Sequence, residues 1–125
     1  MAANKLVRFG PVALTGTLTT NILNPGTVTG GVSAGGSAVA SLYYVLRHIR
    51  ITNKTNGAVT FSLWIGGTGG NVAGTEFLGT GLSIAANSAY DFYGAVRLDT
   101  ADFLVGGASA GTSLTLECEG EVGIA

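Results

Sequence analysis

The sequence of 125 residues is poor in charge, and this scarcity limits the partners that it can attract. Charged residues make up 10% of the chain, against about 25% in an average soluble protein. Six Lys and Arg are balanced by seven Asp and Glu, which gives a net charge of −1. No basic run occurs, so we expect no nucleic-acid partner, because phosphates are bound by clustered cations.

Reactive side chains are equally scarce. Cys118 is the only cysteine, which excludes a disulfide within the chain, and we expect a buried, inert thiol. His48 is the only histidine and stands close to Arg47 and Arg50, a cationic setting that we expect to lower its basicity. The sequence contains no recognisable set of acid, base, nucleophile or metal ligands. It therefore predicts a non-enzymatic protein with no cofactor and no metal.

Long apolar runs are also missing. No segment approaches the ~20 apolar residues that a helix needs to span a bilayer, and the first residues lack the apolar core of a signal peptide. We therefore expect no membrane partner, and a chain that is made and used in soluble form without classical secretion.

Glycine, by contrast, is abundant, with 21 residues, and the apolar fraction is 46%. From Leu42 onward apolar and polar residues alternate, with turn signals about every ten residues, which is typical of antiparallel strands. No longer stretch has a helical period. The pattern predicts an all-β fold, an antiparallel β-sandwich of jelly-roll type with seven to eight short strands.

The first part of the chain differs from the rest. Residues 1–41 contain both prolines and a Gly/Ser-rich stretch at 30–37. We expect a strand or extended arm followed by a loop there, with a Thr-rich strand within 12–22. Residues 42–125 are expected to form the β-sandwich core of what is a single domain overall.

An Asn56-Gly57 pair separates the two runs with the highest β-propensity, residues 42–53 and 58–65. Both residues of the pair tolerate positive φ, which two-residue hairpin turns require. The sequence therefore predicts a tight hairpin at this point.

Three acidic residues, Glu117, Glu119 and Glu121, alternate along the last predicted strand. They mark one face of that strand, which either is solvated or pairs with arginines of neighbouring strands or subunits. Trp64 lies opposite the apolar face of its own strand, and core, subunit interface and glycan platform are all open to it. Arginine and aromatic side chains are common interface anchors. The predicted protein-contact residues are Arg47, His48, Arg50, Trp64 and Arg97.

Three segments resemble, in style and strand layout, small structural proteins of tailed-bacteriophage virions: 48–53 (HIRITN), 61–66 (FSLWIG) and 98–110. The resemblance covers roughly residues 42–125. It implies a non-enzymatic protein located in the virion, which is assembled in the host cytoplasm, most simply a capsid decoration (cement) protein that stabilises the phage head. Its implied partners are other copies of itself, with a trimer as one arrangement, and a major capsid or other virion protein.

The resemblance also allows a second position on the particle. In that alternative the chain is a tail- or fibre-associated module that binds a receptor or a carbohydrate. Exposed Tyr43, Trp64 or Tyr93, beside the loop at 66–70, would then form the binding site.

Overall fold

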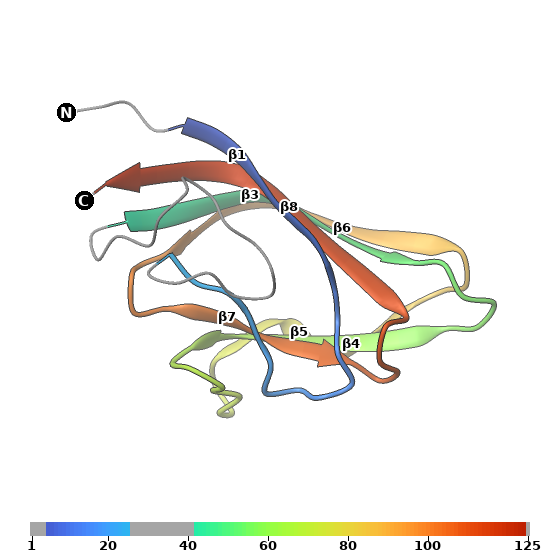
Figure 1. The fold of residues 1–125 in the computed structure, drawn as a ribbon. Coiled ribbons are helices and arrows are strands. Elements are labelled where there is room, and N and C mark those ends of the chain that lie inside the picture. The colour runs from blue at the N-terminus through green and yellow to red at the C-terminus, as the bar shows by residue number, and fades with distance from the viewer. Residues whose placement is uncertain (1–4, 26–41, 125) are drawn as a thin grey trace.

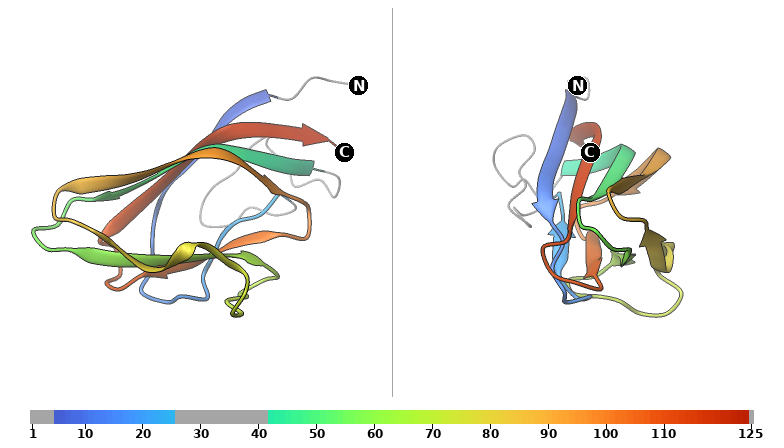
Figure 2. Two further views of the ribbon diagram at one scale, coloured as in Figure 1. Left: turned by 180° about the vertical axis from the view of Figure 1, so that it is seen from behind. Right: turned by 90° about the vertical axis from the view of Figure 1, so that its right-hand side faces the viewer.

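The computed structural model describes residues 5–25 and 42–124 and confirms the all-β prediction. Within these residues there is no helix, and eight strands form two four-stranded antiparallel sheets (Figure 1). The sheets stack as two layers, which Figure 2 shows from two further directions. Their strand orders, β1-β8-β3-β6 and β2-β7-β4-β5, are those of an eight-stranded jelly roll.

We call the first of these sheet A and the second sheet B. The strands of sheet A are β1 (Lys5–Ala13), β8 (Leu114–Ile124), β3 (Leu42–Asn53) and β6 (Ser88–Leu98). The strands of sheet B are β2 (Asn21–Leu23), β7 (Phe103–Ala108), β4 (Val59–Gly66) and β5 (Glu76–Ile84).

The core lies between the two sheets and is built from the alternating apolar positions. Sheet A contributes Ile49 and Leu116, and sheet B contributes Phe61 and Leu104, each at most 2% exposed. Because successive side chains of a strand point to opposite faces, the other half of each strand is directed away from the core. The alternation read from the sequence therefore gives the correct inward face of β3, β4 and β8.

The beginning of the chain contributes to both sheets. β1 pairs with β8, and β2 pairs with β7. A single Thr-rich strand within 12–22 is wrong, because β1 ends at Ala13 and β2 begins at Asn21. The residues between them cross from sheet A to sheet B, and the carbonyls of Thr15 and Thr20 accept hydrogen bonds from the backbone of β7. The Gly/Ser-rich stretch at 30–37 lies outside the described residues.

The predicted Asn56-Gly57 hairpin is also wrong. The strands on either side of it, β3 and β4, belong to different sheets and do not pair, and neither residue has a positive φ. The buried Asn53 side chain organises this corner instead: its Nδ2 donates to the carbonyls of Gly57 and Ile84, at 2.9 and 3.0 Å, and its Oδ1 accepts from the Thr55 amide at 2.9 Å. Among the described strands, the only neighbours along the chain that share a sheet are β4 and β5.

A β-bulge in β3 places two consecutive side chains, Arg47 and His48, on the same outer face of sheet A. The register of β3 against β8 shifts between Leu46 and His48, so that Arg47 is an extra residue. Leu46 and Ile49 both point into the core, and the two residues between them both point outward. On the partner strand Gly120 faces the bulge, and a Cβ there would collide with the carbonyl oxygen of Val45.

Candidate functional site

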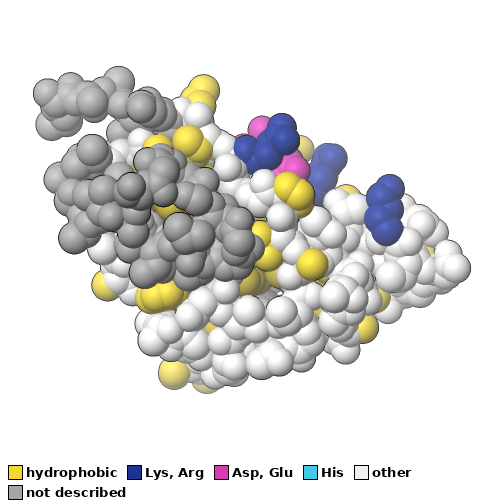
Figure 3. Space-filling view, in the orientation of Figure 1, with side chains coloured by type: hydrophobic (Ala, Val, Ile, Leu, Met, Phe, Trp, Pro, Cys, Tyr) yellow, Lys and Arg dark blue, Asp and Glu magenta, His cyan; other side chains and the backbone are white. Residues whose placement is uncertain are grey.

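Most of the charged side chains of this protein gather on the outer face of sheet A. All four arginines and the three C-terminal glutamates lie on its strands, whereas Glu76 is the one charged residue within the described strands of sheet B. Figure 3 shows the same asymmetry on the side that it presents, where the charged side chains follow sheet A. We call this surface the charged face; it consists of Leu6, Arg8, Tyr43, Arg47, His48, Arg50, Asp91, Tyr93, Arg97, Glu117, Glu119 and Glu121.

Charge alternates from strand to strand across this face. Along the row that crosses the face at Arg8 of β1, Glu117 of β8, Arg50 of β3 and Asp91 of β6, each side chain lies beside one of opposite sign; Arg97, near the end of β6, lies outside this row. Cross-strand neighbours on one face of a sheet are about 5 Å apart at Cβ, which is close enough for ion pairs. Fold topology, rather than proximity in sequence, thus brings these residues together.

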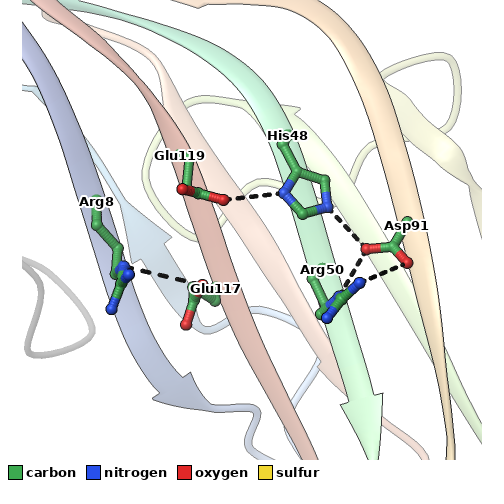
Figure 4. Close-up of polar contacts among 6 residues, drawn as sticks. All are labelled: Arg8, His48, Arg50, Asp91, Glu117 and Glu119. Carbon is green, nitrogen blue, oxygen red and sulfur yellow. Dashed lines mark hydrogen bonds and ion pairs between the residues drawn. The ribbon is translucent and has the colours of Figure 1, made fainter.

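His48 lies at the centre of the charged face (Figure 4). Its Nε2 is 2.7 Å from Oδ1 of Asp91 on β6, and its Nδ1 is 3.1 Å from Oε1 of Glu119 on β8. Arg50 donates from Nε to the same Asp91 oxygen at 2.8 Å. The ring of Tyr93 stacks on the imidazole, with the centroids 4.6 Å apart and the planes 8° from parallel. One imidazole therefore links three strands of sheet A.

This environment reverses the prediction that His48 is a weakened base. The hydrogen bond to Asp91, and after it the one to Glu119, raises the pKa of His48 above its ordinary value of 6.5. The pKa of Asp91 is lowered by its hydrogen bonds with Arg50 and then His48. Two carboxylates in direct contact outweigh the arginines nearby in sequence, because a charge-assisted hydrogen bond acts at far shorter range.

Arg47 and Arg97 are also held by carboxylates. Arg47 donates to Oε2 of Glu121 at 2.8 Å, and Arg97 donates to Oδ1 of Asp99 at 2.7 Å. The Arg97 guanidinium also lies over the ring of Tyr43, 4.0 Å from its centroid. Of the two alternatives for the glutamates, pairing with neighbouring strands is thus observed within one chain.

Four of the five predicted contact residues, Arg47, His48, Arg50 and Arg97, share the charged face. The fifth, Trp64, is on β4 in the other sheet and is only 6% exposed, so its ring offers little surface to a partner. The three aromatics of the carbohydrate-binding alternative do not form one site either, because they lie on different sheets. Tyr43 and Tyr93 belong to sheet A, whereas the loop at 66–70 follows β4 of sheet B.

Sequence reasoning did not single out Leu6, Arg8 and Asp91. Leu6 is 85% exposed, and Tyr93 on the opposite edge strand is 71% exposed. Outward positions were recognisable in β6 from its alternation, because Asp91 and Tyr93 alternate with Tyr90 and Phe92. Which strands lie next to β6 could not be read in the same way.

The rest of the described structure offers little chemistry. Cys118 is fully buried, which confirms the predicted burial, and burial raises the pKa of its thiol to about 12. No group of three or more His, Cys, Asp or Glu side chains within the described ranges is arranged to hold a metal ion. Nor does the described part of the chain contain a helix of the length and apolar character needed to cross a membrane.

A hollow of about 340 Å³ lies between β1 and β2. The described residues that line it include Val12, Thr15, Thr20 and Asn21, and none of them is charged. It contains no group suited to acid, base or nucleophilic catalysis.

Comparison with known proteins adds no identity: no family model matches the sequence, and no curated protein matches it.

Proposed function

We propose that this chain is a non-enzymatic structural protein of a tailed-bacteriophage virion, and that it acts as a capsid decoration protein which stabilises the head through protein–protein contacts. The observation that supports this proposal best is the composition of the charged face. All four arginines and the exposed Tyr93 lie on this one surface. Protein interfaces are enriched in Arg and Tyr and depleted in Lys.

The ion pairs give this surface a fixed geometry. His48 and Arg50 are held by hydrogen bonds to Asp91, and Arg47 is held to Glu121. Side chains already ordered in the unbound protein lose less conformational entropy on binding. Even a modest contact then suffices on a shell, because many identical contacts act together.

The fold is consistent with this role by analogy only. Jelly rolls occur in viral capsid proteins, but they also occur in lectins, and a fold does not by itself fix a function. The analogy therefore leaves the tail- or fibre-associated binding module as the second candidate. Tyr93, 71% exposed, is the aromatic residue that this candidate would use.

The test of the proposal is the number of copies of this chain in purified particles of the phage that encodes it, measured by quantitative mass spectrometry. A copy number that matches the capsid lattice supports decoration. A few copies per particle indicate the tail or fibre instead, and absence from the particle overturns the virion assignment.

Binding to capsids stripped of this chain then tests the surface. We expect Arg97→Ala and Tyr93→Ala to weaken rebinding at least about tenfold, as loss of an interface anchor typically does. Val72→Ala, which alters an exposed apolar residue in the loop between β4 and β5, serves as the matched control and should rebind like the wild type. If the charged-face variants rebind as well as the control, this face is not the contact surface.

The carbohydrate-binding candidate is tested by a glycan array with the same Tyr93→Ala variant. Trp64→Ala is unsuitable because Trp64 is buried, and its loss would disturb packing. Glycan binding that Tyr93→Ala abolishes would favour the second candidate over decoration.

A further inference from the structure

We propose that this protein associates with further copies of itself head to tail, by pairing the β1 edge of one chain with the β6 edge of the next. β1 and β6 are the two edge strands of sheet A: in the described structure β1 pairs only with β8, and β6 pairs only with β3. An edge strand presents backbone donors and acceptors that can pair with another chain.

Strand direction permits this continuation. All neighbours in sheet A are antiparallel, so β1 and β6, three steps apart, run in opposite directions. A second copy placed beside the first in the same orientation therefore brings its β1 antiparallel to β6. The result is a continuous sheet with the same hydrogen-bonding pattern throughout.

The side chains of the two edges match in a single register. Opposite residues of an antiparallel pair have a constant sum of residue numbers, and aligning Leu6 with Tyr93 also aligns Arg8 with Asp91. Leu6 and Tyr93, 85% and 71% exposed, are the large apolar side chains of sheet A with the highest exposure among the described residues. The register would cover both of them and place a cation opposite an anion.

In this register the regularly paired segment of β1 lies opposite the regularly paired segment of β6. β1 is regular from Lys5 to Phe9, where its pairing with β8 becomes irregular. β6 is regular up to Tyr93, where its pairing with β3 shifts. In the proposed register Phe9 lies opposite Tyr90, so both regular segments are used together.

The charge pattern favours pairing of β1 with β6 of another copy over pairing of two identical edges. Signs alternate along the row Arg8, Glu117, Arg50 and Asp91, and Arg8 of a second copy, placed opposite Asp91, continues that alternation. Arg8 is available for the new contact, because its side chain is 64% exposed and its Nε is 3.9 Å from Glu117. Pairing of β1 with β1 of another copy would bring the two Arg8 side chains to the same edge.

A head-to-tail interface leaves one edge of each kind open, so that it repeats, as a ring where the rotation between copies closes and as an open filament where it does not. This inference does not depend on the proposed function. A chain that assembles through these edges and is absent from phage particles supports the inference and overturns the function.

Disulfide trapping tests the register directly. Leu6 and Tyr93 of one chain are separated by at least three strand spacings, about 14 Å, which is too far for a disulfide. In the Leu6→Cys, Tyr93→Cys double variant, any disulfide between the two introduced thiols must therefore join two chains. The native Cys118 is fully buried and should not interfere.

On mild oxidation of the full chain we expect the double variant to form covalent species at multiples of 12.5 kDa. Mixing the Leu6→Cys and Tyr93→Cys single variants should give a cross-linked dimer, whereas each single variant alone should remain at the mass of one chain. Linkage within either single variant, or none in the mixture, overturns the proposal.

Mass in solution provides a second readout. Light scattering should give a multiple of the chain mass for the wild type, and Leu6→Glu should reduce it to one chain while circular dichroism shows an intact fold. Val72→Glu, which places the same charge at a residue 67% exposed outside sheet A, should leave the wild-type mass unchanged. A wild type that is monomeric at every concentration tested overturns the proposal.

Discussion

At the level of single residues, His48 shows how completely cross-strand contacts set the properties of a side chain. Asp91 and Glu119 are 43 and 71 residues away in sequence, yet they raise its pKa. With both ring nitrogens protonated, the imidazole donates one hydrogen bond to each carboxylate. These bonds tie β6 and β8 to the strand between them, so protonation of one ring affects three strands.

The stability of the protein should therefore depend on pH through His48. A pKa raised by folding contributes stability that is fully present below the unfolded value, near 6.5, and is lost as the pH rises through the folded pKa. We expect the melting temperature to fall across this window in the wild type and to fall less in His48→Gln, as measured by circular dichroism. Equal slopes in the two proteins would contradict this prediction.

Asp91 contributes in the opposite direction. Its pKa is lowered from 3.8, so its contribution is present above that value and is lost as the pH falls through the lower folded pKa. Asn56→Ala, which changes an exposed residue outside the charged face, is the control for both windows and should keep the wild-type pH dependence.

At the level of elements, the corner between β3 and β4 depends on Asn53 rather than on a hairpin turn. Asn53 is fully buried, and its amide nitrogen donates to the carbonyls of Gly57, Ile84 and Ala85. The same side chain thus joins the end of β3 to the end of β5. This connection fixes how the chain passes from sheet A to sheet B.

Replacing this amide should destabilise the protein. Asn53→Ala leaves buried carbonyls without their donor, and we expect a loss of about 1–3 kcal/mol in the free energy of unfolding. Asn56→Ala, at a position that a hairpin turn would have made critical, should change the free energy of unfolding by less than about 0.5 kcal/mol. Urea denaturation measures both. A larger loss for Asn56→Ala than for Asn53→Ala would contradict this account of the corner.

A second prediction at the level of elements concerns the β3 bulge. A methyl group at Gly120 would overlap the Val45 carbonyl, and neither backbone can move without altering the pairing of β3 with β8. We expect Gly120→Ala to cost about 1–3 kcal/mol or more.

Gly66→Ala is the matched control, because Gly66 is also a strand residue and no atom lies within 4 Å of the added carbon. It should be close to neutral in the same urea denaturation experiment. If the two variants are equally stable, the close backbone approach at Gly120 does not constrain the sheet.

At the level of the whole molecule, the core cannot be completed by residues 42–125 alone. The first 25 residues supply Phe9, Leu14, Ile22 and Leu23, each at most 2% exposed. Losing one buried Leu or Phe typically costs about 2–5 kcal/mol, and the total stability of a domain is only about 5–15 kcal/mol. The two sheets therefore depend on β1 and β2.

We expect a fragment of residues 42–125 to lack a cooperative thermal transition, because four core positions and two edge strands are missing. Circular dichroism and amide NMR dispersion measure this. Leu18→Ala in the full chain, at a residue 40% exposed in the same early segment, should keep the transition. A folded, cooperative fragment would show that β1 and β2 are dispensable.

The sequence by itself determined the fold class and the inward face of most strands. Both follow from alternation with a period of two, which any strand with one buried face must show, as in Phe61 and Leu63. The inert Cys118 followed from the same alternation, because it falls on the apolar side of its strand.

Only the tertiary structure decided which strands are neighbours and, through them, which side chains meet. Asn56-Gly57 is a strong local turn signal, yet the corner depends on a carbonyl 31 residues away from Asn53. The basicity of His48, the pairing of Arg50 with Asp91 and the bulge at Arg47 all depend on the order β8-β3-β6. The physical reason is that hydrogen bonds and ion pairs act over a few ångströms in space, and a jelly roll brings residues within that range from distant parts of the chain.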